Sequence, residues 1–498
     1  MSLQQYQTAT GGREITNQAC ALACPVSLGD LAGILGLGPQ ALGMVAGRGE
    51  TMVKRVCIDS RAAGPDTLFV ALKGARTDGH AYLEDIARAG CIAALVSFDF
   101  AAGQPEHLRS LATEHGLVAL IVADPLRSLQ EWASAWLGTL QGLVRVGVTG
   151  SNGKTTTKEL LQQVLSVRKR VFASPGNLNS VIGLPLAALA VEPGTGIAVF
   201  EMAMSERGEM QRLARLVFPD LAIITNIGTA HIGNIGSQEA IALEKKQIFS
   251  AFDGLGVAFI PGDDDFAHLL ASGVKGSVIR FGEHDTAGYQ GWEAWESGQI
   301  LKWGGETIHL HAAGRHVRSD ALAAISLAVH LGMEAADIRQ GLEAWRPAFG
   351  RNELLEGRMR VVQDCYNANP DSMKAAIEAF MEQDPGAGGR AMVLGDMREL
   401  GSHSADAHAE LGRRLADLPI DVLLLFGTEV QATWQAWHSA GGTAARGSAL
   451  CAQFEELARR AENLLQDGDL VLLKASRGME LERLTPVLLG PDNHSRTH

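Results

Sequence analysis

Short apolar runs of strand length recur through most of this chain, separated by segments whose apolar residues have helical spacing. The first strand-like runs cover residues 53–58, 67–72, 92–96 and 117–122, and a helical pattern covers 82–89. They predict a small α/β domain over residues 26–123. Residues 1–25 are rich in Gln, Thr, Ala and Gly and show no sustained period, so we expect a flexible extension there.

A second set of alternating segments lies between the dipeptides Asp124-Pro125 and Arg346-Pro347, which both indicate linkers. Its predicted strands cover 143–148, 197–202 and 221–227, and its clearest helices cover 126–140 and 319–331. Residues 254–303 hold short strands with many glycines. This pattern predicts a central domain over residues 124–346 with a mostly parallel sheet.

The last part of the chain repeats a strand–helix alternation. Predicted strands cover 359–365, 391–394, 422–426 and 470–473, and predicted helices cover 373–380, 405–415 and 451–465. This order is typical of a doubly wound, Rossmann-like domain, here residues 347–498. A length of 498 residues also suggests about three domains, so the expected fold class is α/β with three domains.

Composition narrows the class of protein. A hydrophobic content of 46% and 57 glycines fit a large, loop-rich enzyme, whereas a net charge of −13 and 5% aromatic residues argue against nucleic-acid binding. The six cysteines are scattered, which indicates reduced thiols. No apolar run reaches the length of a membrane span and no targeting segment begins the chain, so we expect a cytoplasmic protein without a membrane span.

A strand, a glycine loop, the residues Gly-Lys-Thr and a helix follow one another near residue 150, which is typical of a phosphate-binding loop. Backbone N–H groups and the helix N-terminus would hold phosphates, Lys154 would reach the terminal phosphates, and Thr155 would ligate Mg²⁺. The first glycine of the usual pattern falls on Val148, so an ordinary glycine-rich turn is the alternative. The candidate residues are Gly150, Ser151, Asn152, Gly153, Lys154, Thr155 and Thr156.

Glu201 ends a predicted parallel strand, where it is well placed to hold a metal beside the phosphate loop; a structural cap is the alternative. Taken alone, His231 would be an ordinary loop histidine and Lys245 part of a solvated helix face. A polar loop carrying Asn177 and Asn179 precedes an apolar helix, and its simplest interpretation is a turn with an N-cap.

Polar residues also gather at strand ends in the first predicted domain, where they could grip a sugar or a diphosphate. Solvated turns are the commoner alternative. These candidates are Ser60, Arg61, Lys73, Gly74, Asp78 and His80.

In the last domain, polar loops follow three successive strands: residues 364–372, 394–401 and 474–478. Polar loops at the ends of neighbouring strands favour a binding edge over simple turns.

The order of these motifs resembles the Mur ligases, which are ATP-dependent, amide-forming enzymes of peptidoglycan precursor synthesis. The resemblance covers nearly all of residues 26–483. The loop T-G-S-N-G-K-T-T is common to Mur ligases and folylpolyglutamate synthases. More specific segments match the branch that joins D-alanyl-D-alanine to UDP-N-acetylmuramoyl-tripeptide: D-S-R, L-F-V-A-L-K-G, D-G-H, G-N-L-N, Y-N-A-N-P-D-S, L-G-D-M-R-E-L-G and K-A-S-R-G-M.

The resemblance implies that the first domain binds the UDP end of the substrate, the second binds ATP and magnesium, and the third closes over both. It implies that ATP phosphorylates the terminal carboxylate of the tripeptide and that the amine of D-alanyl-D-alanine attacks the acyl phosphate. Cytoplasmic synthesis by a monomer is expected. Another Mur or folylpolyglutamate-type ligase, or a non-catalytic ATP-binding regulator, is the alternative; the Tyr-Asn-Ala-Asn-Pro segment speaks against other ligases.

Residue roles follow from the same resemblance. Thr155 and Glu201 would ligate magnesium, His231 would help to hold a second ion, and Lys245 matches a carbamylated lysine. Lys154, His231 and Lys245 are therefore the expected catalytic residues. Nucleotide contacts are implied for Asn177, Asp320, Arg351 (phosphate), Asp364 (ribose), Tyr366, Asn367 and Asn369, and substrate contacts for Asn179, Ser476 and Arg477 as well as the first-domain residues.

The chain departs from the family pattern at several positions. Asp320 stands where an asparagine that contacts adenine is expected, and a carboxylate cannot donate the hydrogen bond that an amide supplies. Ala203 and Ser205 follow Glu201 where Gly and Asn are common, and Ala475 replaces a usual glycine. A weakened or adapted enzyme is therefore an alternative, although the phosphate lysine Lys154, both metal-site candidates and the motifs of the third domain are intact.

Overall fold

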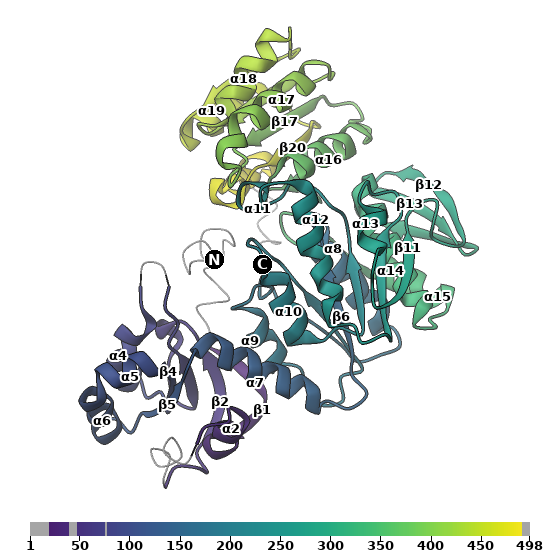
Figure 1. Cartoon of the computed structure of the whole chain (residues 1–498). Coiled ribbons are helices and arrows are strands. Elements are labelled where there is room, and N and C mark those ends of the chain that lie inside the picture. Colours follow the sequence, from purple (N-terminus) through teal and green to yellow (C-terminus); the bar gives the residue numbers. More distant parts are fainter. Residues whose placement is uncertain (1–18, 39–46, 75–76, 491–498) are drawn as a thin grey trace.

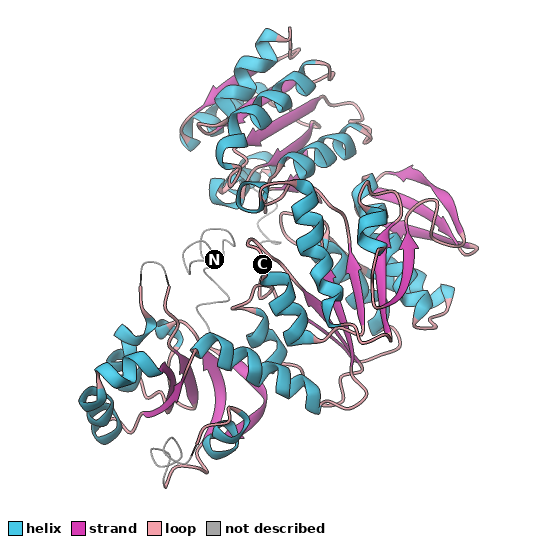
Figure 2. Cartoon of the chain, viewed as in Figure 1, coloured by secondary structure: helices cyan, strands magenta, loops and turns pink. Residues whose placement is uncertain are grey.

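The computed structural model describes residues 19–38, 47–74 and 77–490. Three α/β parts follow one another from the N-terminal part through the central part to the C-terminal part (Figure 1). Helices cover the sheets in each part (Figure 2). The expected α/β class with three domains is confirmed, whereas the residue boundaries assigned to the domains stay predictions.

The N-terminal sheet has the order β1-β2-β3-β4-β5, in which only the β1–β2 pair is antiparallel. Its strands are β1 (Cys20–Ser27), β2 (Met52–Cys57), β3 (Thr67–Val70), β4 (Ala93–Ser97) and β5 (Val118–Val122). Its helices are α2 (Leu28–Ile34), α4 (Leu83–Arg88), α5 (Phe98–Gly103), α6 (Pro105–Glu114) and the short turns η1 (Ser60–Ala62) and η2 (Gly79–Tyr82).

Strand β1 corrects the expected extension. Residues 20–25 belong to this strand rather than to a flexible segment, while residues 1–18 lie outside the described part. The strand is a half-buried edge made mostly of small residues, so its sequence lacks the strong apolar alternation that reveals a strand. The strand ends at Ser27, whose side chain caps helix α2 by accepting a hydrogen bond from the Asp30 N–H.

The central sheet is parallel, with the order β11-β10-β9-β6-β8-β7. Its strands are β6 (Val144–Thr149), β7 (Val171–Ala173), β8 (Ile197–Glu201), β9 (Leu221–Ile224), β10 (Gly256–Pro261) and β11 (Gly276–Phe281). The chain runs from β6 to one side through β7 and β8 and later returns to the other side with β9. The end of β6 is therefore a topological switch point, where ligands bind in sheets of this kind.

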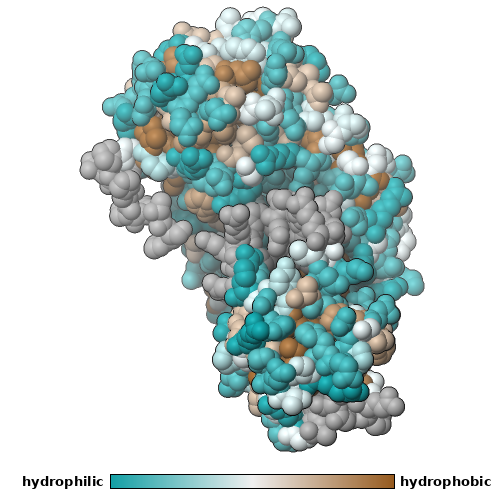
Figure 3. Space-filling view, turned by 90° about the vertical axis from the view of Figure 1, so that its left-hand side faces the viewer, coloured by the Kyte–Doolittle hydropathy of each residue, from teal (hydrophilic) through white to brown (hydrophobic). Residues whose placement is uncertain are grey.

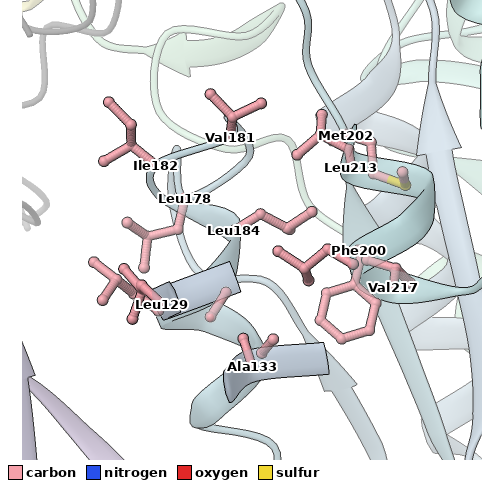
Figure 4. Close-up of a cluster of buried hydrophobic side chains, with 14 of the residues drawn as sticks. Leu129, Ala133, Leu178, Val181, Ile182, Leu184, Phe200, Met202, Leu213 and Val217 are labelled. Atoms are coloured by element: carbon pink, nitrogen blue, oxygen red, sulfur yellow. The ribbon is translucent and has the colours of Figure 1, made fainter. Parts of the chain in front are cut away.

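Helices α8 (Lys154–Ser166), α14 (Arg315–His330) and α15 (Ala335–Ala344) bury apolar residues against one face of this sheet. The opposite face is covered by α7 (Pro125–Thr139), α9 (Leu184–Leu189), α10 (Glu209–Val217), α12 (Gln238–Lys246) and η3 (Gln247–Ala251). Figure 4 shows Leu129 and Ala133 of α7 within this second core, near Leu184 and Phe200. The short helices α11 (Ile232–Ile235) and α13 (Ala267–Ala271) lie in loops after β9 and β10.

A small antiparallel sheet, β12-β13-β14, extends the central part beside α15 (Figure 1). Its strands are β12 (Tyr289–Trp295), β13 (Gly298–Trp303) and β14 (Glu306–Leu310). They account for part of the glycine-containing strands expected over residues 254–303.

The C-terminal sheet has the order β15-β16-β20-β17-β18-β19, parallel except for the β15–β16 pair. Its strands are β15 (Glu353–Glu356), β16 (Arg360–Asp364), β17 (Arg390–Gly395), β18 (Val422–Phe426), β19 (Gly447–Cys451) and β20 (Leu470–Lys474). Helices α16 (Pro370–Met381), α17 (Ser404–Ala416) and α18 (Val430–Ser439) cover one face, and α19 (Phe454–Leu464) and α20 (Thr485–Leu489) cover the other. The 3-10 turns are η4 (Gly401–His403), η5 (Arg477–Met479) and η6 (Leu481–Leu484).

Within the described ranges, no helix is both long enough and apolar enough to span a bilayer. Hydrophilic residues cover most of the visible face in Figure 3, with smaller apolar areas between them.

Candidate active site

The phosphate loop lies at the switch point of the central sheet, between a strand and a helix as its sequence predicts. Strand β6 ends at Thr149 and helix α8 begins at Lys154. Gly153 occupies the N-cap with a φ of 78°, a left-handed conformation that favours glycine. The loop backbone is also tied to the segment after β9, because the Ser151 N–H donates to the carbonyl of Asn226 at 3.0 Å.

Lys154 folds back over the loop. Its Nζ donates to the carbonyl oxygens of Gly150 and Ser151 at 2.8 and 3.1 Å. Burial lowers the pKa of Lys154, against the attraction of Glu201. A cation held above loop N–H groups at a helix N-terminus is suited to bind terminal phosphates.

Glu201 lies beside the loop at the end of β8 and is 3% exposed. Thr155 Oγ1 donates to Glu201 Oε2 at 2.9 Å, and Asn179 Nδ2 donates to Oε1 at 2.8 Å. Burial opposes ionisation, but Lys158, followed by Arg351 and Lys154, holds the pKa of Glu201 below its usual value. The carboxylate is therefore ionised and oriented towards the Thr155 hydroxyl.

Lys158 is a buried cation that the sequence did not single out. Its Nζ lies 3.7 Å from Glu201 Oε2 and donates to the carbonyl of Ser174 at 3.1 Å. It stands four residues after Lys154 on α8, so both lysines share one helix face. That spacing is the only sequence signal for it, and most lysines at such positions are solvated.

His231 and Lys245 approach the loop from the segment after β9. Burial lowers the pKa of His231 to about 3, and the charges of Lys245 and Lys154 add to the shift. Lys245 is 1% exposed and donates from Nζ to the Gly150 carbonyl at 2.8 Å. Burial, followed by repulsion from Lys154, holds the pKa of Lys245 well below its usual range. The site therefore combines a neutral imidazole with a buried lysine whose pKa lies well below its usual range.

Asp320 packs against the loop from α14 and is 3% exposed. Its Oδ1 accepts a 3.1 Å hydrogen bond from Thr157 Oγ1, whereas its Oδ2 is buried without a hydrogen-bond partner in the described part of the chain. Burial raises the pKa of Asp320 well above its usual value, against the attraction of Lys154 and Arg351. The protonated acid has one donor and one acceptor, as an amide does, so the expected loss of the donor does not apply to this form.

The C-terminal part supplies a second polar group. Lys474 is 1% exposed and donates from Nζ to Asp364 Oδ2 at 2.7 Å and to the Asn367 carbonyl at 3.1 Å. The guanidinium of Arg351 lies 4.1 Å from the centre of the Tyr366 ring, which holds its charge at the edge of the site. These contacts position the residues that follow β16.

One cavity of about 440 Å³ joins the two groups. Predicted site residues that line it are Ser151, Asn152, Gly153, Lys154, Thr155, Thr156, Asn177, Asn179, Glu201, His231, Asp320, Arg351, Asp364, Tyr366, Asn367 and Asn369. Trp345 and His316 also line it, although the sequence did not mark them, and Lys474 and Asp371 line it from two of the polar loops expected at a binding edge. Their placement depends on contacts between distant segments, which a single sequence does not reveal.

Other predicted residues lie elsewhere. Gly150 belongs to the phosphate loop and Lys245 donates to its carbonyl, but neither residue lines the cavity. Ser476 Oγ accepts a hydrogen bond from the Arg398 N–H, and Arg477 forms an ion pair with Glu482. Both residues therefore hold the loop after β20 together within the C-terminal part.

The first-domain candidates form their own group in the N-terminal part. Arg61 is largely exposed and forms an ion pair with Asp59 at 2.5 Å, and Lys73 forms a backbone bridge with Asp78. His80 is 6% exposed; its Nδ1 lies 2.6 Å from Asp78 Oδ1, and its Nε2 accepts from the Ser97 N–H at 3.0 Å. Both ring nitrogens are therefore used in joining the loop to the end of β4. Ser60 lies in η1, and Gly74 directly follows Lys73, the residue that forms the bridge with Asp78.

Family profiles match both larger parts of the chain. The Mur ligase middle domain matches residues 148–328, and the Mur ligase, glutamate ligase domain matches residues 350–477. The chain belongs to the Mur ligase family. A relative from Treponema pallidum (strain Nichols), UDP-N-acetylmuramoyl-tripeptide–D-alanyl-D-alanine ligase, is 38% identical over 452 residues, which cover 89% of this chain and 95% of the relative.

Solved structures extend the similarity of this Mur ligase to its whole architecture. A crystal structure of MurF from Acinetobacter baumannii is 29% identical with a TM-score of 0.81, covering 94% of this chain and 99% of that one. The MurF ligase from Thermotoga maritima in complex with ADP is 28% identical with a TM-score of 0.74, covering 88% and 97%. The similarity therefore includes most of the N-terminal sheet, beyond the two matched family domains.

Proposed function

We propose that this chain is an ATP-dependent ligase that joins D-alanyl-D-alanine to UDP-N-acetylmuramoyl-tripeptide in peptidoglycan precursor synthesis. The observation that carries this function is the near full-length similarity to the ligase of that name from Treponema pallidum, at 38% identity. The cavity supports it, because it brings a phosphate loop, an ionised carboxylate and C-terminal residues to one place.

The reaction has two steps. A carboxylate oxygen of the tripeptide attacks the γ-phosphorus of ATP, the bond to the bridging oxygen breaks, and ADP leaves. The amine of D-alanyl-D-alanine then attacks the carbonyl carbon of the acyl phosphate, loses a proton, and phosphate leaves with the bonding electron pair. Both steps bring negative charges together, so fixed positive groups in the site lower the barrier.

The phosphate loop supplies those groups. The N-terminus of α8 and the loop N–H groups bind phosphate oxygens, and Lys154 neutralises charge on the transferred phosphoryl group. Nucleotide binding is supported by the ADP complex of the Thermotoga maritima relative. Arg351, Asp364 and Asn177 line the same cavity and are the proposed further contacts to the nucleotide.

Thr155 and Glu201 fit a magnesium ion. Mg²⁺ is commonly bound through one or two carboxylates together with substrate phosphates, and this site offers one buried carboxylate next to a hydroxyl. Within the described residues, no cluster of three or more His, Cys, Asp or Glu side chains could hold a metal ion, so phosphate oxygens would complete the set. When bound, the ion would neutralise negative charge on the phosphate oxygens.

His231 and Lys245 fit a second cation. Neutral imidazole is a metal ligand, and burial keeps His231 neutral. A neutral lysine amine can react with CO₂ to form a carbamate, which would give the site a second anionic oxygen group. The low pKa of Lys245 supports this modification.

The N-terminal part is the proposed site for the UDP end of the substrate. Ser60, Arg61, Lys73, Gly74 and Asp78 present polar groups there, and His80 orders the loop that carries Asp78. The monomeric state stays a prediction.

The test is coupled ADP release measured over a small matrix of UDP-peptides and amine acceptors. We expect release only when the UDP-tripeptide and D-alanyl-D-alanine are both present, together with one equivalent of new amide product. Equal release with a free amino acid in place of the dipeptide would contradict the acceptor. ATP binding without turnover under every combination would favour a non-catalytic regulator.

A further inference from the structure

The C-terminal part contacts the phosphate-binding part through two polar interactions at the start of α16. Asn369 Nδ2 donates to Asn152 Oδ1 in the phosphate loop at 2.9 Å. Asp371 Oδ2 accepts from the Thr229 N–H at 2.5 Å and from Thr229 Oγ1 at 2.7 Å. Both contacts join residues more than a hundred positions apart in the sequence.

The contact of Asp371 is the stronger of the two. A carboxylate that accepts two hydrogen bonds from one residue is charge-assisted, and such bonds are about twice as strong as neutral ones. Asp371 also lies in the first turn of α16, where the helix dipole stabilises a negative charge. The fit is close, because a Cβ added at Gly228 would lie 2.5 Å from Asp371 Oδ2.

Thr229 stands two residues before His231, whose φ of 67° is unusual for a residue other than glycine. On the other side of His231, a Cβ added at Gly233 would lie 3.6 Å from the carbonyl oxygens of Glu399 and Leu400. Helix α11 therefore lies directly against the C-terminal part (Figure 1). The segment that carries His231 is held on both sides by that part of the chain.

Asn152 receives the second contact at a point that is already fixed. Its N–H donates to Asn226 Oδ1 at 3.0 Å, and its carbonyl accepts from Thr225 Oγ1 and Asn226 Nδ2. The Gly228 N–H donates to Ser151 Oγ at 2.8 Å. A shift of the segment 225–229 therefore moves the phosphate loop as well.

From this geometry we propose that Asp371 is a positioning residue, through which docking of the C-terminal part sets the segment 228–231 and the phosphate loop in their reactive arrangement. The inference rests on the proposed function, in which that loop transfers the phosphoryl group.

The test is a double-mutant cycle with Thr229→Val and Asp371→Ala in the full chain, measuring amide formation and ADP release. Each single substitution should lower kcat about tenfold or more, because each removes charge-assisted hydrogen bonds. The kcat of the double variant should not fall below that of the less active single variant, because both substitutions remove the same contact. KM for the UDP-tripeptide should stay unchanged, since its proposed contacts lie in the N-terminal part.

A second readout does not need turnover. Binding of Mn²⁺ together with ADP, measured by titration calorimetry, should weaken in both single variants if the segment carrying His231 is displaced. Thr229→Ser keeps the hydroxyl and should restore both kcat and binding. Glu378→Ala removes an exposed carboxylate on the same helix, 3.9 Å from Lys374 of that helix, and should leave both values at the wild-type level.

Additive losses in the cycle, or wild-type kcat and Mn²⁺ binding in the single variants, would overturn the inference. If a single variant has a lowered melting temperature, the role of Asp371 is judged from the Thr229→Ser variant and from the binding of Mn²⁺ with ADP. A wild-type chain that makes no amide with D-alanyl-D-alanine would contradict the proposed function instead. In that case the Mn²⁺ and ADP titration still tests the role of Asp371.

Discussion

The hydroxyl of Thr155 donates a 2.9 Å hydrogen bond to Glu201 Oε2, which joins the first turn of α8 to the end of β8. Lys158 Nζ lies 3.7 Å from the same carboxylate oxygen, on the next turn of the helix. Glu201 is thus already ionised and aimed at the phosphate loop by residues of one helix. A magnesium ion would meet a prepared ligand, but it would compete with the Thr155 hydroxyl and with the charge of Lys158.

Replacing Lys158 with methionine tests that preparation. Lys158 is the main group that lowers the pKa of Glu201, so its loss should raise this pKa. A carboxylate with a lowered pKa loses its charge as pH falls through that pKa, so the acid limb of kcat should move to higher pH in the variant. Loss of one partner of a buried pair should also destabilise the fold by about 3–5 kcal/mol.

The measurements are the pH profile of ADP release and urea unfolding. Lys158→Arg keeps the charge and serves as the control for the pH profile. An acid limb unchanged in Lys158→Met would show that Lys158 does not set the ionisation of Glu201.

Lys154→Ala should reduce kcat for ADP release by about 10²–10³-fold or more, because a fixed cation at the transferred phosphoryl group is lost. The same full-length variant should bind the UDP-tripeptide with wild-type affinity, since the proposed contacts lie in the N-terminal part. Calorimetric binding and coupled ADP release check the two expectations. Activity near the wild-type level would contradict the role of the phosphate loop.

The sequence predicted those parts of the fold in which apolar periodicity is strong. Strand β18 was predicted at its observed bounds, and the loop between β6 and α8 was found from its glycines and Lys154. Strand β19 was not predicted, and the helix expected over 451–465 begins only at Phe454. The sequence of β19, Gly-Ser-Ala-Leu-Cys, consists largely of small residues, as does much of β1, so neither strand stands out by its apolar pattern.

Candidate residues could be predicted where the order of strands brings their ends together. Glu201 ends strand β8 and Lys154 follows the neighbouring parallel strand β6, and the two residues meet in the cavity as expected. The sequence does not single out Lys158, and it indicates Asp371 only as part of the polar loop 364–372, because the contacts of both side chains are with residues far away in the sequence. The family motif implies substrate contacts for Ser476 and Arg477, yet these residues do not line the cavity.

Asp320→Asn tests whether the buried acid is neutral. Burial raises the pKa of Asp320 in the folded chain above its unfolded value of about 4, so its contribution to stability is complete below that pH. The contribution is lost as pH rises through the folded pKa. Asparagine does not titrate and can still accept the hydrogen bond from Thr157.

The Tm of Asp320→Asn minus that of the wild type should therefore increase from pH 5 towards pH 9 by about a few degrees. ADP affinity should be retained at neutral pH, because the amide offers the same donor and acceptor as the neutral acid. A difference in Tm that does not change with pH would show that Asp320 is ionised in the folded chain.

Lys245 provides the last test, because its amine is buried and its pKa is held well below the usual range by burial and by Lys154. The neutral amine can attack CO₂, which forms a carbamate and releases one proton. We expect a carbamate signal in ¹³C NMR after incubation with ¹³C-bicarbonate, and its absence in Lys245→Arg, whose guanidinium stays protonated. ADP release should fall in CO₂-depleted buffer and recover with bicarbonate. If activity is independent of bicarbonate and no signal appears, the unmodified amine is the working form, and its 2.8 Å hydrogen bond to the Gly150 carbonyl then supports the loop as a structural contact.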